Sequence, residues 1–175
     1  AEFGQRGWRW ETSSVLPTAL RLAGDVEVTK TSAFHGGRVE IQDLGSQLLL
    51  EAAGIAAGER WLDACAGAGG KTLQLARLLG ASGRVDAHDI RPAALDELAA
   101  RARRAQLDSI RILRPPVADT YDGVLVDAPC SGSGTWRRAP HLKWTTTPEQ
   151  IEAAAATQRE LLARFAAHVR PGGRL

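Results

Sequence analysis

From Val39 onward, short apolar segments alternate with amphipathic segments, and this alternation constrains the fold more than any other feature. The apolar segments lie at 60–64, 83–89, 110–113 and 121–128. Helices are expected at 46–53, 69–80, 91–105 and from Pro148 to about Val169. Strands that alternate with helices predict a parallel sheet covered on both faces. The expected fold class is therefore α/β, with an open Rossmann-like sheet that binds its ligand at the carboxyl ends of the strands.

The first 38 residues do not follow this alternation. We expect a short helix around Pro17–Leu22, closed by Gly24, and a short strand at 25–30. This is too little for a domain of its own. We therefore interpret 1–38 as a linker or the end of an N-terminal domain, and 39–175 as a second domain.

Composition excludes several classes of protein. The chain has 175 residues, 44% hydrophobic and 24% charged, which suits one globular domain with a core. Apolar runs fall far short of the roughly 18 residues of a membrane span, and no signal peptide is visible. Cys65 and Cys130 make no disulfide framework, so we expect reduced thiols in the cytoplasm, with no membrane and no metal as partners. A net charge of +2 permits nucleic-acid binding without arguing for it. We expect a monomer.

The stretch "LDACAGAGGKT", residues 62–72, joins the first expected strand to a helix. Its glycines allow a tight turn and close approach of a ligand to free helix amides. The G-x-G-G spacing differs from a dinucleotide fingerprint, and Cys65 stands where a P-loop needs glycine. Asp89 ends the next strand, where α/β nucleotide folds hold ribose hydroxyls. Together they favour a nucleoside with a small charged tail, such as S-adenosylmethionine. The alternatives are a plain tight turn, and a helix cap for Asp89.

A second loop follows the strand at 121–128, which we expect to lie beside the strand at 60–64. Here Asp127 is followed by Ala128, Pro129 and Cys130. Pro129 restricts the backbone and aims the thiol, and nearby arginines favour a thiolate, so Cys130 should face the glycine loop. The alternative is a small buried hydrophobe. Cys65, inside the tight glycine loop, is interpreted as a packing residue.

A run of cations and aromatics comes next along the chain. Such an arrangement can grip phosphates and stack on unpaired bases, although a solvated loop with buried tryptophans is the alternative. The residues are Trp136, Arg137, Arg138, His141, Lys143 and Trp144.

The strings "DACAGAGGKT" and "DAPCSGSGTWRRAPHLKW", with "IQDLGSQL" ahead of them, resemble the Sun/Fmu-type RNA cytosine-5 methyltransferases, which include the bacterial 16S ribosomal RNA methyltransferase B. The resemblance runs from about Val39 to Leu175 and implies an S-adenosylmethionine-dependent enzyme whose partner is ribosomal RNA. Residues 1–38 would then end an N-terminal RNA-binding domain or form a linker. The implied cofactor contacts are Cys65, Ala66, Gly67, Ala68, Gly69, Gly70, Lys71, Asp89 and Asp127. The implied RNA contacts are Arg137, Arg138, Lys143 and Trp144.

Two positions depart from the family's usual glycine loop, because Ala68 replaces a proline and Gly67 an alanine, which implies a looser loop. The family also places an acidic residue after the third strand to hold the adenine amine. Asp119 is the candidate for that role here.

The implied chemistry explains the thiol. A thiolate that adds to C6 of cytosine makes C5 nucleophilic toward the methyl group, and a carboxyl near N3, assigned to Asp127, takes up the developing charge. The resemblance assigns C6 addition to a cysteine in a T-C-S element shortly after "PGG", and product release to Cys130. In DNA cytosine-5 enzymes the cysteine at the place of Cys130 is itself the nucleophile. Cys130 is therefore expected to be catalytic, in one role or the other.

We expect the domain to be incomplete at its C-terminus. Only Arg174 and Leu175 of the next strand would be present, the T-C-S element would follow, and the strand at 121–128 would lack an outer neighbour. Three other functions were weighed. A non-catalytic domain that binds S-adenosylmethionine and RNA is the main alternative. A DNA enzyme would need a large target-recognition insert, and an amino-methylating enzyme would show N-P-P-[YF] where this chain has D-A-P-C.

Overall fold

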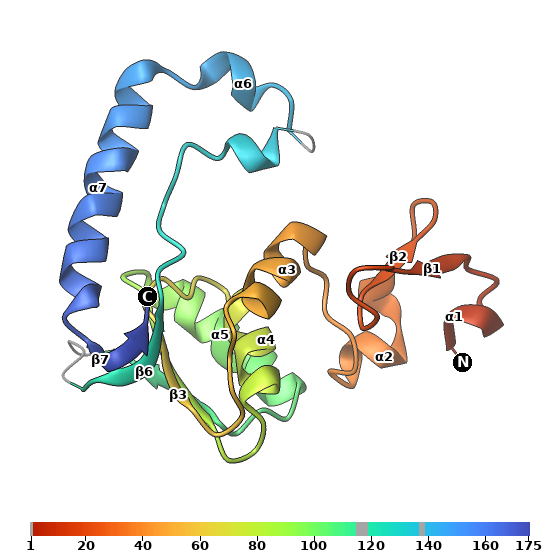
Figure 1. The fold of residues 1–175 in the computed structure, drawn as a ribbon. Coiled ribbons are helices and arrows are strands. Elements are labelled where there is room, and N and C mark those ends of the chain that lie inside the picture. The colour runs from red at the N-terminus through yellow and green to blue at the C-terminus, as the bar shows by residue number, and fades with distance from the viewer. Residues whose placement is uncertain (1, 115–118, 137–138) are drawn as a thin grey trace.

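A computed structural model describes residues 2–114, 119–136 and 139–175. Its core is a five-stranded parallel sheet with the strand order β5-β4-β3-β6-β7 (Figure 1). The strands are β3 (Arg60–Asp63), β4 (Arg84–His88), β5 (Ile110–Leu113), β6 (Tyr121–Leu125) and β7 (Val169–Arg174). β3 lies at the centre, between β4 and β6, and its pairing with β6 confirms the prediction that these two strands are neighbours. The α/β class is confirmed.

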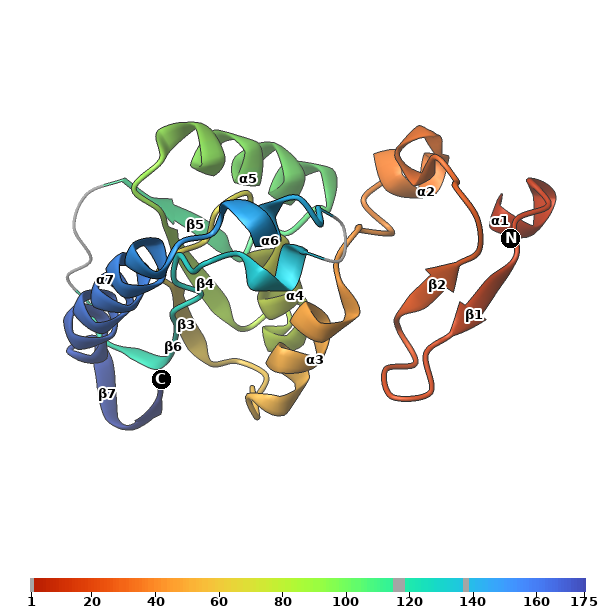
Figure 2. The same cartoon turned by 90° about the horizontal axis from the view of Figure 1, so that it is seen from above.

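Helices cover both faces of this sheet. α3 (Leu44–Ala52), α4 (Gly70–Leu79) and α5 (Pro92–Arg104) lie on one face, and α7 (Pro148–Ala166) lies on the other (Figure 2). All four were predicted to within a few residues, because each has a local signal. For example, Pro92 occupies the first turn of α5, and Gly80 with φ 70° ends α4.

The core forms where the apolar face of each helix meets the sheet. Leu75 and Leu79, one turn apart on α4, pack with Trp61 and Val85 of the sheet. On the opposite face, Phe165 of α7 packs in a second buried cluster with strand residues Leu62, Tyr121 and Val124. Each of these side chains is at most 3% exposed, so the two faces together anchor the carboxyl ends of β3, β4 and β6.

The C-terminal strand differs from the prediction. α7 ends at Ala166, and β7 begins at Val169 rather than at Arg174. β7 pairs with β6, with Val169 opposite Tyr121 and Arg174 opposite Gly123, and the register shifts between these pairs. Pro171 and Gly172, which were expected to stop the helix, lie in this irregular part of the strand, and Gly172 has φ 76° there. β6 therefore has an outer neighbour, and the prediction that it would lack one is wrong.

The predictions for 1–38 are also wrong in detail. α1 (Glu2–Gln5) is followed by a hairpin of β1 (Trp10–Thr12) and β2 (Leu20–Leu22), so the segment expected to be a helix, Pro17–Leu22, is instead a turn followed by a strand. The strand expected at 25–30 is instead a 3₁₀ turn, Val28–Lys30, followed by α2 (Ser32–His35). The pairing with β1 overrides the local helix signal. At the turn, Thr31 donates through its hydroxyl to Val28 O and accepts from Phe34 N–H, which fixes the start of α2.

Between β6 and α7 the chain leaves the sheet. We call 126–147 the arm; its described part contains a 3₁₀ turn, Ser133–Thr135, and α6 (Leu142–Thr145) (Figure 1). A capping box closes the arm onto α7, because Thr147 and Gln150 exchange backbone and side-chain hydrogen bonds. The arm therefore carries the residues 127–144 singled out in the sequence.

Candidate functional site

The glycine loop joins β3 to α4 and is tied to the end of β4. Ala66 N–H donates to His88 O at 2.9 Å, and Gly67 N–H donates to the Asp89 carboxylate at 2.8 Å. Gly69 has φ 91°, and a Cβ there would lie 2.7 Å from Leu98 Cγ of α5. Glycine is required at this position for both reasons, so the loop is closed tightly against α5.

Arg91 holds Asp89 in place in addition to the glycine loop. The Asp89 side chain is 5% exposed, and Arg91 contacts it with its backbone N–H at 2.9 Å and its Nε at 2.9 Å. These hydrogen bonds, those from Arg91 first, lower the pKa of Asp89 to about 2. The residue capping α5 is Arg91, so Asp89 does not cap the helix itself. Asp89 instead connects the glycine loop to the start of α5, and its lowered pKa keeps the carboxylate ionised at neutral pH.

A pocket of about 570 Å³ opens at the carboxyl ends of β3, β4 and β6. It is lined by seven of the eight residues that the sequence assigned to the cofactor site from the loop and β4. These are Cys65, Ala66, Gly67, Ala68, Gly70, Lys71 and Asp89, while Gly69 lies beneath Leu98 and does not line it. Asp127 and Pro129 line it from the arm. The structure thus brings the two sequence loops together at one pocket.

Several lining residues were missed in the sequence. They are Gln42 and Ser46 before and within α3, Asp63 and His88 at the ends of β3 and β4, Ile90 and Arg91, and Thr157, Leu161, Arg164 and Phe165 of α7. Asp63 lies within the quoted string 62–72 and His88 directly precedes Asp89, so their position at strand ends could have identified them. The α7 residues are more than 60 positions away from β4, and no local signal points to them.

Three lining side chains carry buried polar atoms without a hydrogen-bond partner in the part of the chain that the structure describes. They are Gln42 Nε2, Asp63 Oδ1 and His88 Nδ1. Asp63 is fully buried and accepts a hydrogen bond from the Thr72 hydroxyl at 2.7 Å through its other oxygen. Burial raises the pKa of Asp63 to about 6. Unpaired buried atoms of this kind are what a bound polar ligand satisfies.

An ion pair connects the glycine loop to the arm. Lys71 Nζ, in the first turn of α4, lies 2.7 Å from Asp127 Oδ2. The Lys71 side chain is largely buried, and Asp127 is half exposed. The ammonium therefore holds the Asp127 carboxylate at the pocket while leaving part of it open to another molecule.

The two cysteines differ in environment. Cys65 lines the pocket, and burial raises the pKa of its thiol to about 11, which keeps it protonated and agrees with its interpretation as a packing residue. Cys130 is exposed, and Gly132 N–H lies 3.4 Å from its sulfur. It is not a lining residue, because the chain has already left the sheet in the arm. Pro129, the residue before Cys130, is held in place by Gln158 of α7, which donates to Pro129 O at 2.9 Å.

The candidate RNA contacts lie further along the arm. Arg137 and Arg138 are outside the described residues. Lys143 and Trp144 are on α6, where Trp144 is 83% exposed and Lys143 Nζ lies 5.6 Å from its ring centroid. Asp119, the candidate for the adenine amine, is not a pocket residue. Its carboxylate pairs with Arg60 at 2.6 Å.

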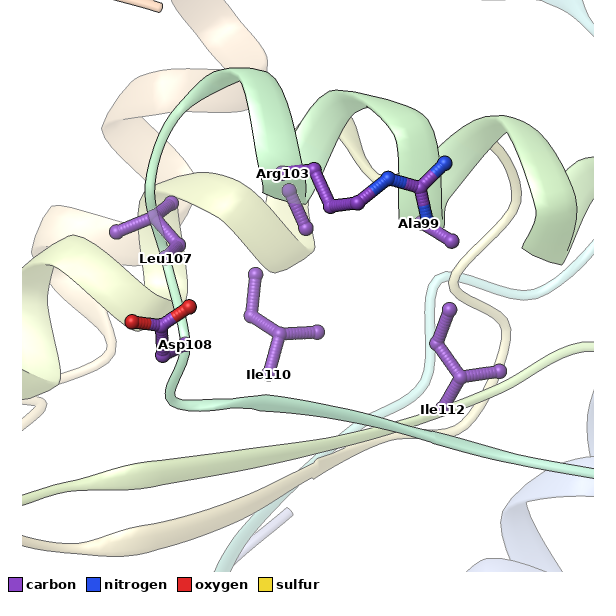
Figure 3. A pocket seen from close by; sticks show the side chains of 7 residues that line it. Ala99, Arg103, Leu107, Asp108, Ile110 and Ile112 are labelled. Carbon is purple, nitrogen blue, oxygen red and sulfur yellow. The ribbon is translucent and has the colours of Figure 1, made fainter.

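A second hollow, of about 310 Å³, lies between α5 and the edge strand β5 (Figure 3). It holds apolar side chains from both elements, with Arg103 and Asp108 at its rim, and contains no residue assigned from the sequence. Among the described residues, no group of three or more histidine, cysteine or acidic side chains is placed to hold a metal. No helix in the described ranges is long and apolar enough to cross a membrane.

Comparison with known proteins gives consistent matches. Residues 51–175 match the family described as 16S rRNA methyltransferase RsmB/F. A putative methyltransferase of Mycobacterium tuberculosis is 41% identical over 82% of the chain, and a probable ribosomal RNA small subunit methyltransferase B of Synechocystis is 36% identical over 91%. The chain spans 33% and 38% of the lengths of these two relatives.

Solved structures agree with the fold. The crystal structure of PH0851 superposes with a TM-score of 0.92 at 30% identity, over 98% of this chain and 41% of that one. A methyltransferase homologue from Pyrococcus horikoshii superposes with a TM-score of 0.83 at 26% identity, over 98% of this chain and 56% of that one. The Rossmann-like sheet predicted from the sequence is the fold of these proteins.

Proposed function

Because the chain belongs to the RsmB/F family of 16S rRNA methyltransferases, we propose that it is the cofactor-binding and catalytic-loop part of an enzyme that methylates C5 of a cytosine in ribosomal RNA. The methyl donor of this family is S-adenosylmethionine. The observation that supports the proposal is the joining of the glycine loop and the D-A-P-C loop at one pocket through the Lys71–Asp127 ion pair. We place the domain boundary near residue 38, as the sequence suggests.

The polar groups of the pocket fit S-adenosylmethionine. Asp89 offers a carboxylate to the ribose hydroxyls, which would share it with the exposed side chain of Arg91. The unpaired atoms of Asp63 and Gln42 offer an acceptor to the ammonium and a donor to the carboxylate of the amino-acid tail. When bound, the cofactor supplies an electrophilic methyl group.

The arm supplies the groups that act on the base. A thiolate attacks C6 of cytosine, forming a C–S bond, and the electron pair of the C5–C6 double bond moves into the ring so that C5 becomes nucleophilic. Asp127, positioned by Lys71, passes a proton from its carboxyl group to N3 as negative charge develops there, and takes the proton back when the thiol is expelled. After C5 is methylated, a base removes the C5 proton, and the C–S bond breaks to expel the thiol.

Cys130 serves this cycle in one of two roles. The resemblance assigns C6 addition to a cysteine in a T-C-S element beyond Leu175, with Cys130 assisting release. The exposure of Cys130 outside the pocket wall is compatible with a thiol that meets the base only when RNA is bound. The base itself must be unpaired or flipped out, and the exposed Trp144 and its neighbour Lys143 are the arm residues that we assign to its neighbours and backbone.

The cofactor part of the proposal is tested by calorimetry. The protein should bind S-adenosylmethionine, and Asp89→Ala should weaken binding at least tenfold, because the ribose loses its acceptor. Absence of binding by folded protein would refute the cofactor site, and equal binding by both proteins would remove Asp89 from it.

The chemical part is tested with unmodified small-subunit ribosomal RNA and a protein that includes the expected T-C-S element. Methyl transfer should yield 5-methylcytosine. Cys130→Ala should trap a covalent RNA–protein adduct if Cys130 assists release. Loss of the adduct in this variant would make Cys130 the nucleophile instead.

A further inference from the structure

His88 lies at the boundary between two walls of the pocket. It is the last residue of β4, and its carbonyl accepts from Ala66 of the glycine loop. Its side chain lies on the α7 face of the sheet, where its ring centroid is 6.0 Å from that of Phe165. The next residue, Asp89, turns its carboxylate to the loop instead. His88, at the end of β4, and Asp89, the residue after it, therefore point to two different walls of the pocket.

One nitrogen of the His88 imidazole is buried without a partner. The residue is 8% exposed, and Nδ1 is buried with no hydrogen bond among the described residues. Leaving a buried polar atom unpaired costs about 1–3 kcal/mol, so native structures rarely do so without a reason. Because His88 lines the pocket, a molecule held there is the natural source of the missing partner.

The surroundings of His88 indicate what kind of partner fits. Leu161 and the buried Phe165 make the same wall apolar, as suits a flat ring. Arg164, also on α7, has only donors, and the Thr157 hydroxyl already donates to Ala153 O at 3.1 Å. The acidic lining residues are Asp63, Asp89 and Asp127, at the strand ends and in the arm, and none belongs to α7.

We propose that His88 recognises the purine of the cofactor, with a ring nitrogen accepting a hydrogen bond from the 6-amino group. This inference rests on the proposed binding of S-adenosylmethionine in the pocket. His88 is adjacent in sequence to Asp89, where the ribose would bind, and an imidazole that carries a proton on one nitrogen has an acceptor at the other. His88 would thus perform the task that the sequence assigned to Asp119, whose carboxylate is engaged by Arg60.

The test compares two ligands that differ only at the 6-position and N1 of the purine. S-adenosylhomocysteine carries the 6-amino group, whereas S-inosylhomocysteine carries an oxygen at that position, which cannot donate to His88, and a proton on N1. Calorimetry should show a preference of about tenfold for the adenosyl ligand, the size expected for one lost hydrogen bond in a buried site. In His88→Phe, which keeps an aromatic ring against Phe165, the preference should fall below twofold.

Two further variants separate the explanations. His88→Asn keeps an acceptor and should retain part of the preference, with near-ultraviolet circular dichroism confirming the fold of each variant. Asp89→Ala should weaken both ligands alike, because they share the ribose. A tenfold preference that survives in His88→Phe, or no preference in the wild type, would overturn the role of His88 alone. Folded wild type that binds neither ligand would overturn the proposed function.

Discussion

Among single residues, Asp63 has the environment that most alters its chemistry. The carboxyl is fully buried under the glycine loop, and its pKa of about 6 lies above the ordinary value near 4 for aspartate. Between these two values the folded protein binds more protons at this site than the unfolded chain does. The contribution of Asp63 to the free energy of unfolding is therefore full below about pH 4 and is lost as the pH rises through 6.

Asp63→Asn should remove this pH dependence while keeping an acceptor for the Thr72 hydroxyl. Relative to wild type, the free energy of unfolding of the variant should rise by about 2–3 kcal/mol between pH 4 and pH 7, at 1.36 kcal/mol for each pKa unit. Urea denaturation across this range measures the difference. Asp89, whose pKa is lowered, contributes equally in both proteins and cancels. Parallel profiles for the two proteins would show that Asp63 titrates normally.

At the scale of elements, the packing of α5 on the glycine loop leaves no room for a side chain at Gly69 but leaves room for one at Gly70. A side chain at Gly69 would combine a left-handed φ of 91° with a Cβ 2.7 Å from Leu98, whereas a Cβ at Gly70 would meet nothing within 4 Å. Gly69→Ala should destabilise the protein by about 2–4 kcal/mol through strain and overpacking. Gly70→Ala, in the first turn of α4, is the matched control and should cost nothing. Thermal unfolding compares them, and equal losses would contradict the close packing.

α7 holds the loop that carries Cys130 through Gln158. Its amide donates to Pro129 O at 2.9 Å, one residue before Cys130. Gln158→Ala should free this carbonyl, and hydrogen exchange of the Cys130–Gly132 amides should accelerate about fivefold, as expected for the loss of one hydrogen bond of about 1 kcal/mol. Arg159→Ala, at an exposed neighbour on the same helix, is the control. Unchanged exchange in Gln158→Ala would mean that the loop is held by its own backbone.

Which elements were predictable follows from where their determinants lie. α4 lies between Gly69 and Gly80, α5 begins at Pro92, and both repeat their apolar residues at helical spacing, so local sequence identifies them. β2 depends on pairing with Trp10–Thr12 across a hairpin, and the start of β7 depends on a register shift against β6, and neither contact is visible in the segment's own sequence. The same holds for the site. The loops were visible as motifs, whereas the wall that α7 contributes and the contact of Arg91 with Asp89 arise only on folding.

At the scale of the whole molecule, charge does not favour RNA. The net charge of +2 provides little overall attraction, so the RNA binding that we propose would depend on local groups such as those on the arm. α6 presents Trp144 to solvent with Lys143 above its ring. A tryptophan in this position can stack on a base, and the lysine can neutralise a phosphate. These two contributions respond differently to salt, because only the phosphate contact releases counterions.

Titration of an unstructured cytidine-rich oligoribonucleotide at several salt concentrations separates stacking on Trp144 from the phosphate contact of Lys143. Trp144→Ala should weaken binding by about 1–3 kcal/mol and leave the salt slope unchanged, since stacking involves no ion release. Lys143→Ala should lower the slope by about 0.7, and Arg137→Ala with Arg138→Ala by about twice that, for single-stranded RNA. Arg103→Ala, at the rim of the hollow beside β5 (Figure 3), removes the same charge away from the arm and should leave the slope unaltered. If Arg103→Ala lowers the slope as much as Lys143→Ala, RNA binds through diffuse charge and the arm has no special part in it.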